Sequence, residues 1–221
     1  MINVLYEDNH LLFVEKPVNV PVQEDESKDP DLLTLCKQYL KEKYQKPGNV
    51  YLGLVHRLDR PVGGVMVFAK TSKAASRLSE MIRKNEIEKE YLAVIDGIPA
   101  KKSGEFTDYL RKDTKNNRTI VTDETHGKYA SLAYTVLEEH EQMSLVRISL
   151  HTGRSHQIRV QFSSRGYPLV NDQRYHPHPR KGQIALYAVS LRLVHPVTKE
   201  MITVTAEPPH TWPWKEFEVL K

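Results

Sequence analysis

The sequence contains a single cysteine among its 221 residues. One cysteine excludes an internal disulfide framework and any zinc site built from several cysteines. Cys36 shares a helical stripe with Leu32, Leu33 and Leu40, so we expect a small core residue rather than a nucleophile. No apolar run approaches the length of a membrane span, and no basic signal-like segment opens the chain. We therefore expect a globular, cytoplasmic protein.

Low-complexity linkers and internal repeats are also lacking, and proline and glycine residues are spread along the chain as turn punctuation. With 39% hydrophobic residues, the chain can bury a full core. We expect one compact domain over residues 1–221, without a separate binding module ahead of the first strand.

Apolar residues in alternating or continuous runs predict strands at about residues 2–6, 10–15, 64–70, 89–97, 128–138, 143–151, 186–194 and 201–206. Helices are predicted at about residues 32–46, 72–84 and 154–165. Many strands with few crossover helices favour an α+β fold, in which helices flank a mixed, largely antiparallel central sheet.

The charge balance permits a polyanionic partner without requiring one. Lys and Arg outnumber Asp and Glu by 32 to 28, giving a formal net charge of +4. Acidic residues gather in residues 24–31, so the remainder is more basic than the total suggests. Basic residues recur in residues 111–118 (Arg111, Lys112, Lys115 and Arg118) and 174–181, which we interpret as loops. A lone charge run is most often solvated surface, but two beside a candidate active site favour phosphate contact.

Residues 53–70 read Gly-Leu-Val-His-Arg-Leu-Asp-Arg-Pro-Val-Gly-Gly-Val-Met-Val-Phe-Ala-Lys, a strand, a turn and a second strand. Asp59 lies in that turn, where Pro61 restricts the backbone. Arg57 and Arg60 give the carboxylate cationic neighbours, which favour the ionised form that a nucleophile or base needs. A carboxylate that only caps the turn would fit the same pattern, and composition alone favours that interpretation.

The stretch His56-Arg57-Leu58-Asp59, followed five positions after the Asp by Gly64 and then by an apolar strand, resembles the signature of RluA-type pseudouridine synthases. The Asp of that signature is the catalytic residue in the family. The resemblance therefore implies that Asp59 is catalytic.

Two further motifs are similar to those of the same family. Residues 88–94 resemble its second motif, which implies that Tyr91 lines a uridine pocket. Residues 150–161 resemble its third motif, which implies that Arg159 pairs with the catalytic Asp. Residues 5–17 also read like the family's first two strands, so the resemblance spans nearly the whole chain.

The resemblance implies a pseudouridine synthase fold with a catalytic cleft across the sheet. It also implies an isomerase that acts on structured ribosomal or transfer RNA, without a cofactor or metal, and we expect a monomer. Arg57 and Arg60 are candidates to hold the RNA backbone, because guanidinium groups match phosphate geometry. Arg154, near the start of the third helix, is another candidate, although a structural salt bridge is nearly as good an interpretation.

The chain departs from the family in one place. Most members have Thr-Ser before the glycine that follows the catalytic loop, whereas this chain has Val62-Gly63. We therefore expect the positioning of Asp59 to differ from that in relatives.

Two other classes of function compete with this interpretation. A metal hydrolase would use the histidines, of which His176-Pro177-His178 resembles a ligand pair, but their spacing matches no common zinc motif. The other histidines considered are His151, His156, His195 and His210. A non-catalytic RNA-binding module would explain the basic loops, but it gives no reason for Asp59 and Arg159 to occur in matching motifs.

Overall fold

The computed structural model describes residues 2–221, which divide into two units. Each unit is built from two separate stretches of sequence. The first unit contains residues 2–88 and Ala188–Glu207, and the second contains Lys89–Tyr187 and Pro208–Lys221. A single catalytic domain over the whole chain stays a prediction.

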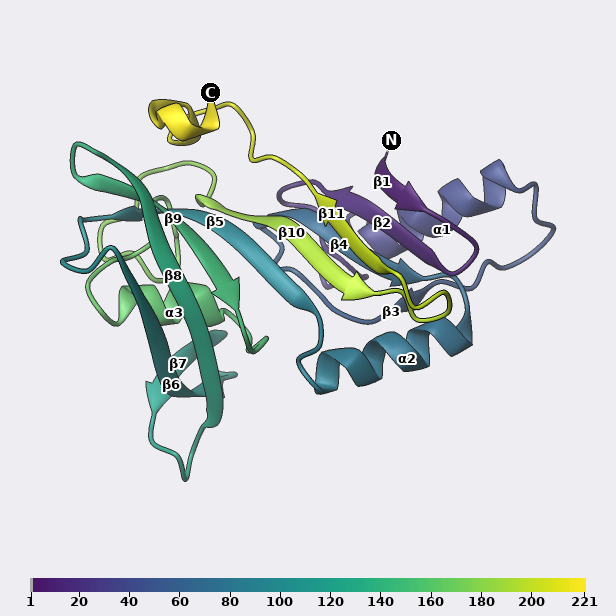
Figure 1. The fold of residues 1–221 in the computed structure, drawn as a ribbon, viewed down its shortest axis with the longest axis horizontal. Helices are drawn as coiled ribbons and strands as arrows, with labels where there is room; N and C mark the ends of the chain where they lie inside the picture. The colour runs from purple at the N-terminus through teal and green to yellow at the C-terminus, as the bar shows by residue number, and fades with distance from the viewer. Residues whose placement is uncertain (1) are drawn as a thin grey trace. The chain divides into compact units, whose positions relative to one another are not determined.

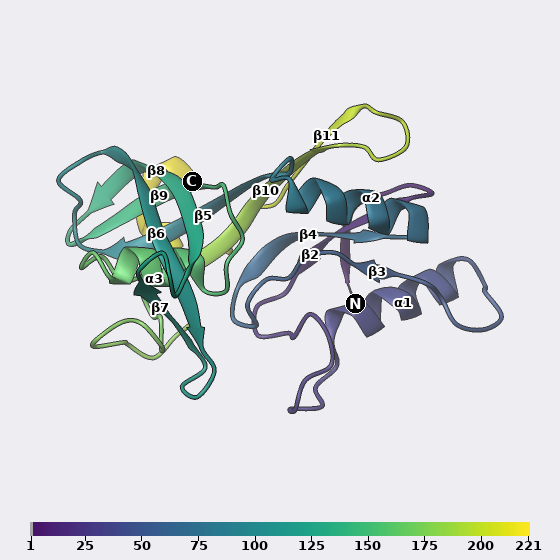
Figure 2. The same ribbon diagram turned by 90° about the horizontal axis from the view of Figure 1, so that it is seen from below.

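The first unit holds one side of the mixed sheet (Figure 1). Its strands follow the order β1 (Asn3–Glu7), β2 (Leu11–Lys16), β4 (Gly63–Ala69) and β10 (Leu186–Val194). The short β3 (Gly53–Leu54) pairs with β4, and β11 (Met201–Thr205) pairs with β10. Two helices, α1 (Leu32–Lys43) and α2 (Ser72–Arg83), lie on opposite sides of β2 and β4 (Figure 2).

Helices on both sides explain why residues 11–14 of β2 and all of β4 are apolar, since neither face of these segments meets water. Leu11 and Phe13 of β2 pack in one buried cluster with Leu78 of α2. Because side chains alternate along a strand, Leu12 and Val14 point to the opposite face, on the side of α1, and both are also fully buried. Burial on both faces fixes the register of β2 against β4, because a shift by one residue would exchange the faces.

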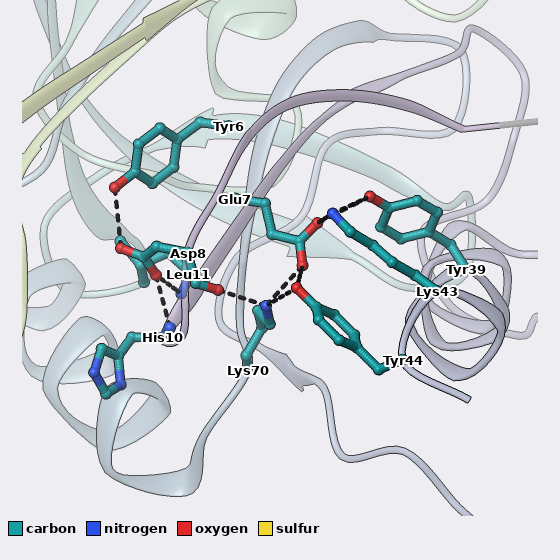
Figure 3. A network of polar contacts seen from close by, with 9 residues as sticks. All are labelled: Tyr6, Glu7, Asp8, His10, Leu11, Tyr39, Lys43, Tyr44 and Lys70. Carbon is teal, nitrogen blue, oxygen red and sulfur yellow. Dashed lines mark hydrogen bonds and ion pairs between the residues drawn. The ribbon is translucent and has the colours of Figure 1, made fainter. Parts of the chain in front are cut away.

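A network around Glu7 joins β1, α1 and the end of β4 (Figure 3). The Glu7 side chain is only 6% exposed. Its carboxylate accepts hydrogen bonds from Lys43 (2.7 Å), Tyr39 (2.9 Å), Tyr44 (2.6 Å) and Lys70 (2.7 Å). Burial alone would raise the pKa of Glu7, but these hydrogen bonds outweigh it and lower the pKa to about 2.

The second unit is an antiparallel sheet with a helix packed against it. Its strands follow the order β5 (Glu88–Asp96), β9 (Met143–Leu150), β8 (Lys128–His140), β6 (Ser103–Asp113) and β7 (Arg118–Thr122). The helix α3 (Gln157–Ser163) packs against β6 and β7 (Figure 1). Its Phe162 ring lies 5.0 Å from that of Phe106 and 5.7 Å from that of Tyr134. Short 3-10 helices follow at Trp214–Glu216 and Glu218–Leu220.

The structure confirms the α+β fold with its mixed sheet and flanking helices. Every strand predicted from the apolar pattern is present within one or two residues of its expected ends. The third helix is shorter than predicted and begins at Gln157, because His156 has a left-handed backbone with φ of 52°. Residues 154–156 therefore form a turn instead of a first helical turn.

The prediction of a loop over residues 111–118 is wrong in part. Arg111 and Lys112 lie in β6, Arg118 begins β7, and only residues 114–117 form the turn between them. Both strands are rich in exposed polar side chains, so they lack the apolar alternation that revealed the others. Residues 174–181 are a loop, as predicted.

Candidate active site

Asp59 lies on the loop between β3 and β4. Its backbone carbonyl accepts a hydrogen bond of 2.9 Å from the Val62 N–H, which closes a turn around Arg60 and Pro61. The Asp59 side chain is partly exposed. Ahead of it, the ring Nε2 of His56 accepts a hydrogen bond of 3.0 Å from the backbone of β4. The loop is therefore tied to β4 on the side that leads into Asp59.

Lys16, the last residue of β2, is fully buried beneath this loop. Its ammonium donates to the carbonyl oxygens of Pro17 (2.9 Å), Arg60 (2.9 Å) and Val62 (2.8 Å). A protonated lysine has three N–H donors, so all of its hydrogen-bonding capacity is used. Burial lowers the pKa of Lys16 to about 7, and the negative charge of Asp59 opposes that shift. Lys16 thus clamps the backbone on the C-terminal side of Asp59.

The unusual pair Val62-Gly63 is accommodated by this clamp. Val62 is buried and brings no side-chain hydroxyl, but its N–H and carbonyl both take part in the hydrogen bonds that hold the loop. Gly64, the next residue, has φ of +120°, and an added Cβ would lie 2.2 Å from the carbonyl oxygen of Ala188. Only glycine fits there, because the backbone conformation and the close approach both exclude a side chain.

The two arginines beside Asp59 have different surroundings. Arg60 is exposed and binds the carbonyl of Asn19 (3.1 Å) and the carboxylates of Asp25 (3.3 Å) and Asp29. The acidic segment of residues 24–31 therefore neutralises part of the positive charge of Arg60, which was predicted to contact RNA. Arg57 is also exposed, and within residues 2–221 its guanidinium has no hydrogen bond or ion pair. A phosphate contact by either arginine stays a prediction.

In the second unit, Arg159 of α3 is held by a carboxylate that the sequence motifs do not reveal. Its Nε and one terminal nitrogen donate to the two oxygens of Asp172, at 2.8 and 2.7 Å. The guanidinium also lies over the ring of Tyr175, 5.2 Å from its centroid. Burial acts to raise the pKa of Asp172, but hydrogen bonds and the charge of Arg159 outweigh it and lower the pKa. This buried, two-point pair fixes the orientation of Arg159.

The turn before α3 is held by one threonine and one glutamine. The Thr152 hydroxyl accepts from the Ser131 N–H (2.9 Å) and donates to the Gln157 side-chain oxygen (2.8 Å). That oxygen also accepts from the Arg154 N–H (3.0 Å), and the Gln157 amide donates to the Ser131 carbonyl (3.1 Å). These buried hydrogen bonds anchor the start of α3 to β8. They therefore fix the position from which the Arg159 side chain extends.

Tyr91 lies in β5, is 9% exposed and pairs in register with Ile148 of β9. Lys89 precedes it by two residues, so both side chains point to the same face of the strand. Lys89 is partly buried, and that burial lowers the pKa of its amine. Position and burial are compatible with the predicted pocket at Tyr91.

The remaining candidates for RNA contact are exposed in the second unit. Arg111, Lys112, Lys115 and Arg118 lie on the β6–β7 hairpin. The Arg118 guanidinium lies over the Tyr175 ring, 5.5 Å from its centroid. Arg154 donates a hydrogen bond of 2.8 Å to the carbonyl of Tyr129. Arg118 and Arg154 thus also have structural contacts.

Asp59 belongs to the first unit, whereas Tyr91 and Arg159 belong to the second. The pairing of Asp59 with Arg159 stays a prediction. Sequence reasoning missed Lys16, which holds the loop of Asp59, and it missed Asp172 and Tyr175, which hold Arg159. A lysine at the end of an apolar strand is usually solvated, so Lys16 drew no attention in the sequence. The only signal for Asp172 and Tyr175 was their position in a loop after the third motif.

The histidine pair that suggested a metal site makes structural contacts. The ring of His176 accepts from the His178 N–H (3.0 Å) and contacts the Asp96 carboxylate (3.0 Å). No group of three or more His, Cys, Asp or Glu suited to a metal occurs within residues 2–221. Cys36 is a buried core residue, as predicted, and burial raises the pKa of its thiol to about 12. Among the described residues, no helix is long and apolar enough to span a membrane.

Comparison with known proteins assigns the family. The sequence model of the family described as RNA pseudouridylate synthase matches residues 10–164. The chain belongs to the RNA pseudouridylate synthase family. It is 34% identical to the ribosomal large subunit pseudouridine synthase D of Haemophilus influenzae, over 91% of this chain and 65% of that protein. It is 32% identical to an uncharacterised RNA pseudouridine synthase of Bacillus subtilis, over 93% of this chain and 68% of that protein.

Solved structures of the same family share the fold. The human RNA pseudouridylate synthase domain containing 4 superposes with a TM-score of 0.79 at 21% identity, covering 94% of this chain and 88% of that chain. The human domain containing 1 protein superposes with a TM-score of 0.76 at 24% identity, covering 96% and 85%. The chain thus has the fold of this family, and it spans 64–65% of the length of the first two curated relatives.

Proposed function

We propose that this protein converts specific uridines of structured RNA to pseudouridine, with Asp59 as the catalytic residue. One observation carries the proposal: Asp59 stands on a loop whose backbone is clamped by the fully buried Lys16. An ammonium is unfavourable to bury unless it is hydrogen-bonded, and Lys16 directs two of its three donors to carbonyls of this loop. Family membership supports the same reaction.

The reaction breaks the N-glycosidic bond of uridine, turns the base and joins the sugar to carbon 5 of the uracil. No atom is gained or lost overall, so the chemistry requires no redox partner. Asp59 either attacks the nucleotide or abstracts a sugar proton, and both routes require an ionised and well-positioned carboxylate.

We expect Arg159 to pair with Asp59 and to keep its carboxylate ionised. Asp172 occupies Nε and one terminal nitrogen of the guanidinium, so the other terminal nitrogen lies outside that pair. The ring of Tyr175 supports the guanidinium face. Arg159 would therefore be an oriented cation rather than a mobile one, which is what the positioning of a catalytic carboxylate needs.

A uridine inside folded RNA is stacked, so it must be flipped out before it can react, at a cost of a few kcal/mol. Tyr91 offers an aromatic face for the flipped base. Stacking on an aromatic side chain contributes about 1–3 kcal/mol per base, which is comparable with the cost of flipping. We assign Tyr91 this role.

Ribosomal RNA is the substrate class that we favour. Relatives that include the Haemophilus protein are named as ribosomal large subunit synthases. The net positive charge of the chain suits any RNA, so it does not separate ribosomal from transfer RNA. Transfer RNA is the alternative, and mapping of the modified position distinguishes the two.

The test is release of tritium from RNA labelled at carbon 5 of uracil, using total cellular RNA that lacks the endogenous modification. We expect wild-type protein to release label, and mapping of the modified position then identifies the RNA. Absence of release from this RNA would overturn the proposal.

Asp59→Asn tests the residue. We expect turnover to fall by at least about a thousandfold with RNA binding retained, because the amide keeps the shape but cannot serve as nucleophile or base. Asp123→Asn, an exposed carboxylate in the turn after β7, is the matched control and should keep wild-type turnover. A non-catalytic binding module would tolerate both changes.

A further inference from the structure

Lys89 is a partly buried cation near the start of β5. Within residues 2–221 its ammonium has no hydrogen bond or ion pair. Burial acts alone on its pKa, which is lowered. The contrast with Lys16 is direct, because that lysine has an acceptor for each of its three donors. Partial burial disfavours the charged form of the amine, and an anion at this position would restore a favourable partner for it.

The space beside the Lys89 ammonium is open on the side of Gly153. A Cβ added to Gly153 would lie 3.7 Å from the Lys89 Nζ, and no other described atom beyond the adjacent residues comes within 4 Å of that position. Gly153 is exposed, so the opening faces solvent. The glycine therefore leaves an access route to the ammonium that any larger side chain would narrow.

The opening lies beside the residue that we assign to the flipped base. Lys89 and Tyr91 share a face of β5, and two residues along a strand span about 6.6 Å. Side chains that start this close together on one face can contact neighbouring groups of one bound strand. A lysine ammonium is a compact charge that binds a phosphate oxygen without demanding one fixed orientation.

We propose that Lys89 and the turn at Gly153 form a phosphate subsite, which holds a backbone phosphate of the RNA next to the nucleotide that stacks on Tyr91. The inference rests on the proposed function for the identity of the ligand. The bound phosphate would pair with the Lys89 ammonium. This contact would hold the RNA strand in place while the target base is flipped out of the stack.

The first experiment uses inorganic phosphate and does not depend on turnover. We expect a saturable NMR shift of the Gly153 amide and the Lys89 ammonium, and a higher pKa of Lys89 with phosphate present than with chloride alone. Lys89→Met should abolish the shift at Gly153. If the Gly153 amide does not respond to phosphate, or responds equally in Lys89→Met, the subsite is refuted.

The second experiment measures RNA binding at several salt concentrations, with an unmodified transcript of the RNA identified by tritium release or, failing release, with total ribosomal RNA. Lys89→Met should weaken binding several-fold and reduce the magnitude of the salt slope by about 0.7, the value for one phosphate of a single strand. Lys101→Met removes a charge from an exposed position of the same unit and is the control. Equal affinity and slope in the two variants would overturn the inference.

Gly153→Val is a second variant that leaves the lysine in place. The residue does not have a left-handed backbone, and the nearest described atom to the added Cβ is at an ordinary contact distance, so we expect the variant to fold. It should weaken RNA binding as Lys89→Met does, because it narrows the access to the ammonium. Wild-type affinity in this variant would count against the subsite. Absence of tritium release by wild-type protein would instead refute only the proposed function.

Discussion

At the scale of single residues, the buried Lys16 and the partly buried Lys89 show how differently one kind of side chain can be used. Lys16 is saturated by backbone carbonyls, two of which belong to the loop that carries Asp59. The Lys89 ammonium, in contrast, is the group that we propose binds an RNA phosphate. Arg159 resembles Lys16, because Asp172 and Tyr175 hold it in place. We therefore propose that Lys16 and Asp172 are positioning residues, which would act on the chemistry through the groups that they orient.

Replacement of Lys16 tests this role. Lys16→Met leaves the carbonyls of Arg60 and Val62 without their donor, so we expect a loss of at least about 2 kcal/mol in the free energy of unfolding. We also expect kcat to fall at least about tenfold with KM nearly unchanged, because the loop loses its alignment while the RNA contacts remain. Denaturant unfolding and steady-state tritium release measure the two effects.

The control for this change is Lys41→Met, which removes an exposed lysine from α1 and should alter neither quantity. A Lys16→Met protein that keeps wild-type kcat would show that the clamp stabilises the fold without positioning Asp59.

At the scale of elements, a hairpin of β6 and β7 stands where the sequence predicted a basic loop. Asp113 holds the turn, because its carboxylate accepts from the N–H groups of Lys115 (3.1 Å) and Asn116 (3.3 Å). The hairpin is also joined to the loop after α3, since the Tyr175 hydroxyl accepts a hydrogen bond of 2.7 Å from the Thr119 N–H. The exposed side chains of Arg111, Lys112 and Arg118 therefore extend from a hydrogen-bonded pair of strands.

Charge reversal on this hairpin tests its predicted role in RNA binding. We expect Lys112→Glu combined with Lys115→Glu to weaken RNA affinity by about tenfold at low salt, because phosphate contacts dominate nonspecific affinity. The rate of tritium release at saturating RNA should change little. A filter-binding titration over a range of salt concentrations measures the effect.

A matched pair of reversals separates local contact from total charge. Lys41→Glu with Lys73→Glu changes net charge equally, at exposed positions on α1 and α2. If this pair weakens binding as much as the hairpin pair, the hairpin has no specific role.

At the scale of the whole molecule, acid stability depends on buried carboxylates that are ionised in the folded state. Glu7 is the clearest case, because its network joins segments that are far apart in the sequence (Figure 3). Its pKa is lowered from 4.5 to about 2. The contribution to folding is therefore complete above pH 4.5, and it is lost as the pH falls through the folded pKa near 2.

Glu7→Gln should remove this dependence. At pH 7 we expect the free energy of unfolding to fall by about 3 kcal/mol, the equivalent of the pKa shift. Between pH 4.5 and 2 the variant should lose less stability than the wild type. Urea unfolding at several pH values measures both effects. Glu80→Gln removes an exposed ion pair with Arg83 and should have a much smaller effect, so an equal loss in both variants would contradict the assignment.

The amino-acid sequence by itself determined the α+β class, most of the strands, the helices and the core position of Cys36. These features depend on local periodicity, which records the face of each element that meets the core. The sequence also located Asp59, Tyr91 and Arg159 through their motifs, although their roles and the pairing of Asp59 with Arg159 stay predictions.

Only the tertiary structure decided which groups support those residues. Lys16 meets carbonyls 44 and 46 positions away, and Arg159 meets Asp172 13 positions away, so no local pattern reveals either contact. Gly64 is required by a backbone segment that approaches it from Ala188. Partners of this kind depend on how distant segments pack, because burial removes water and leaves each polar group to the neighbours that the fold provides.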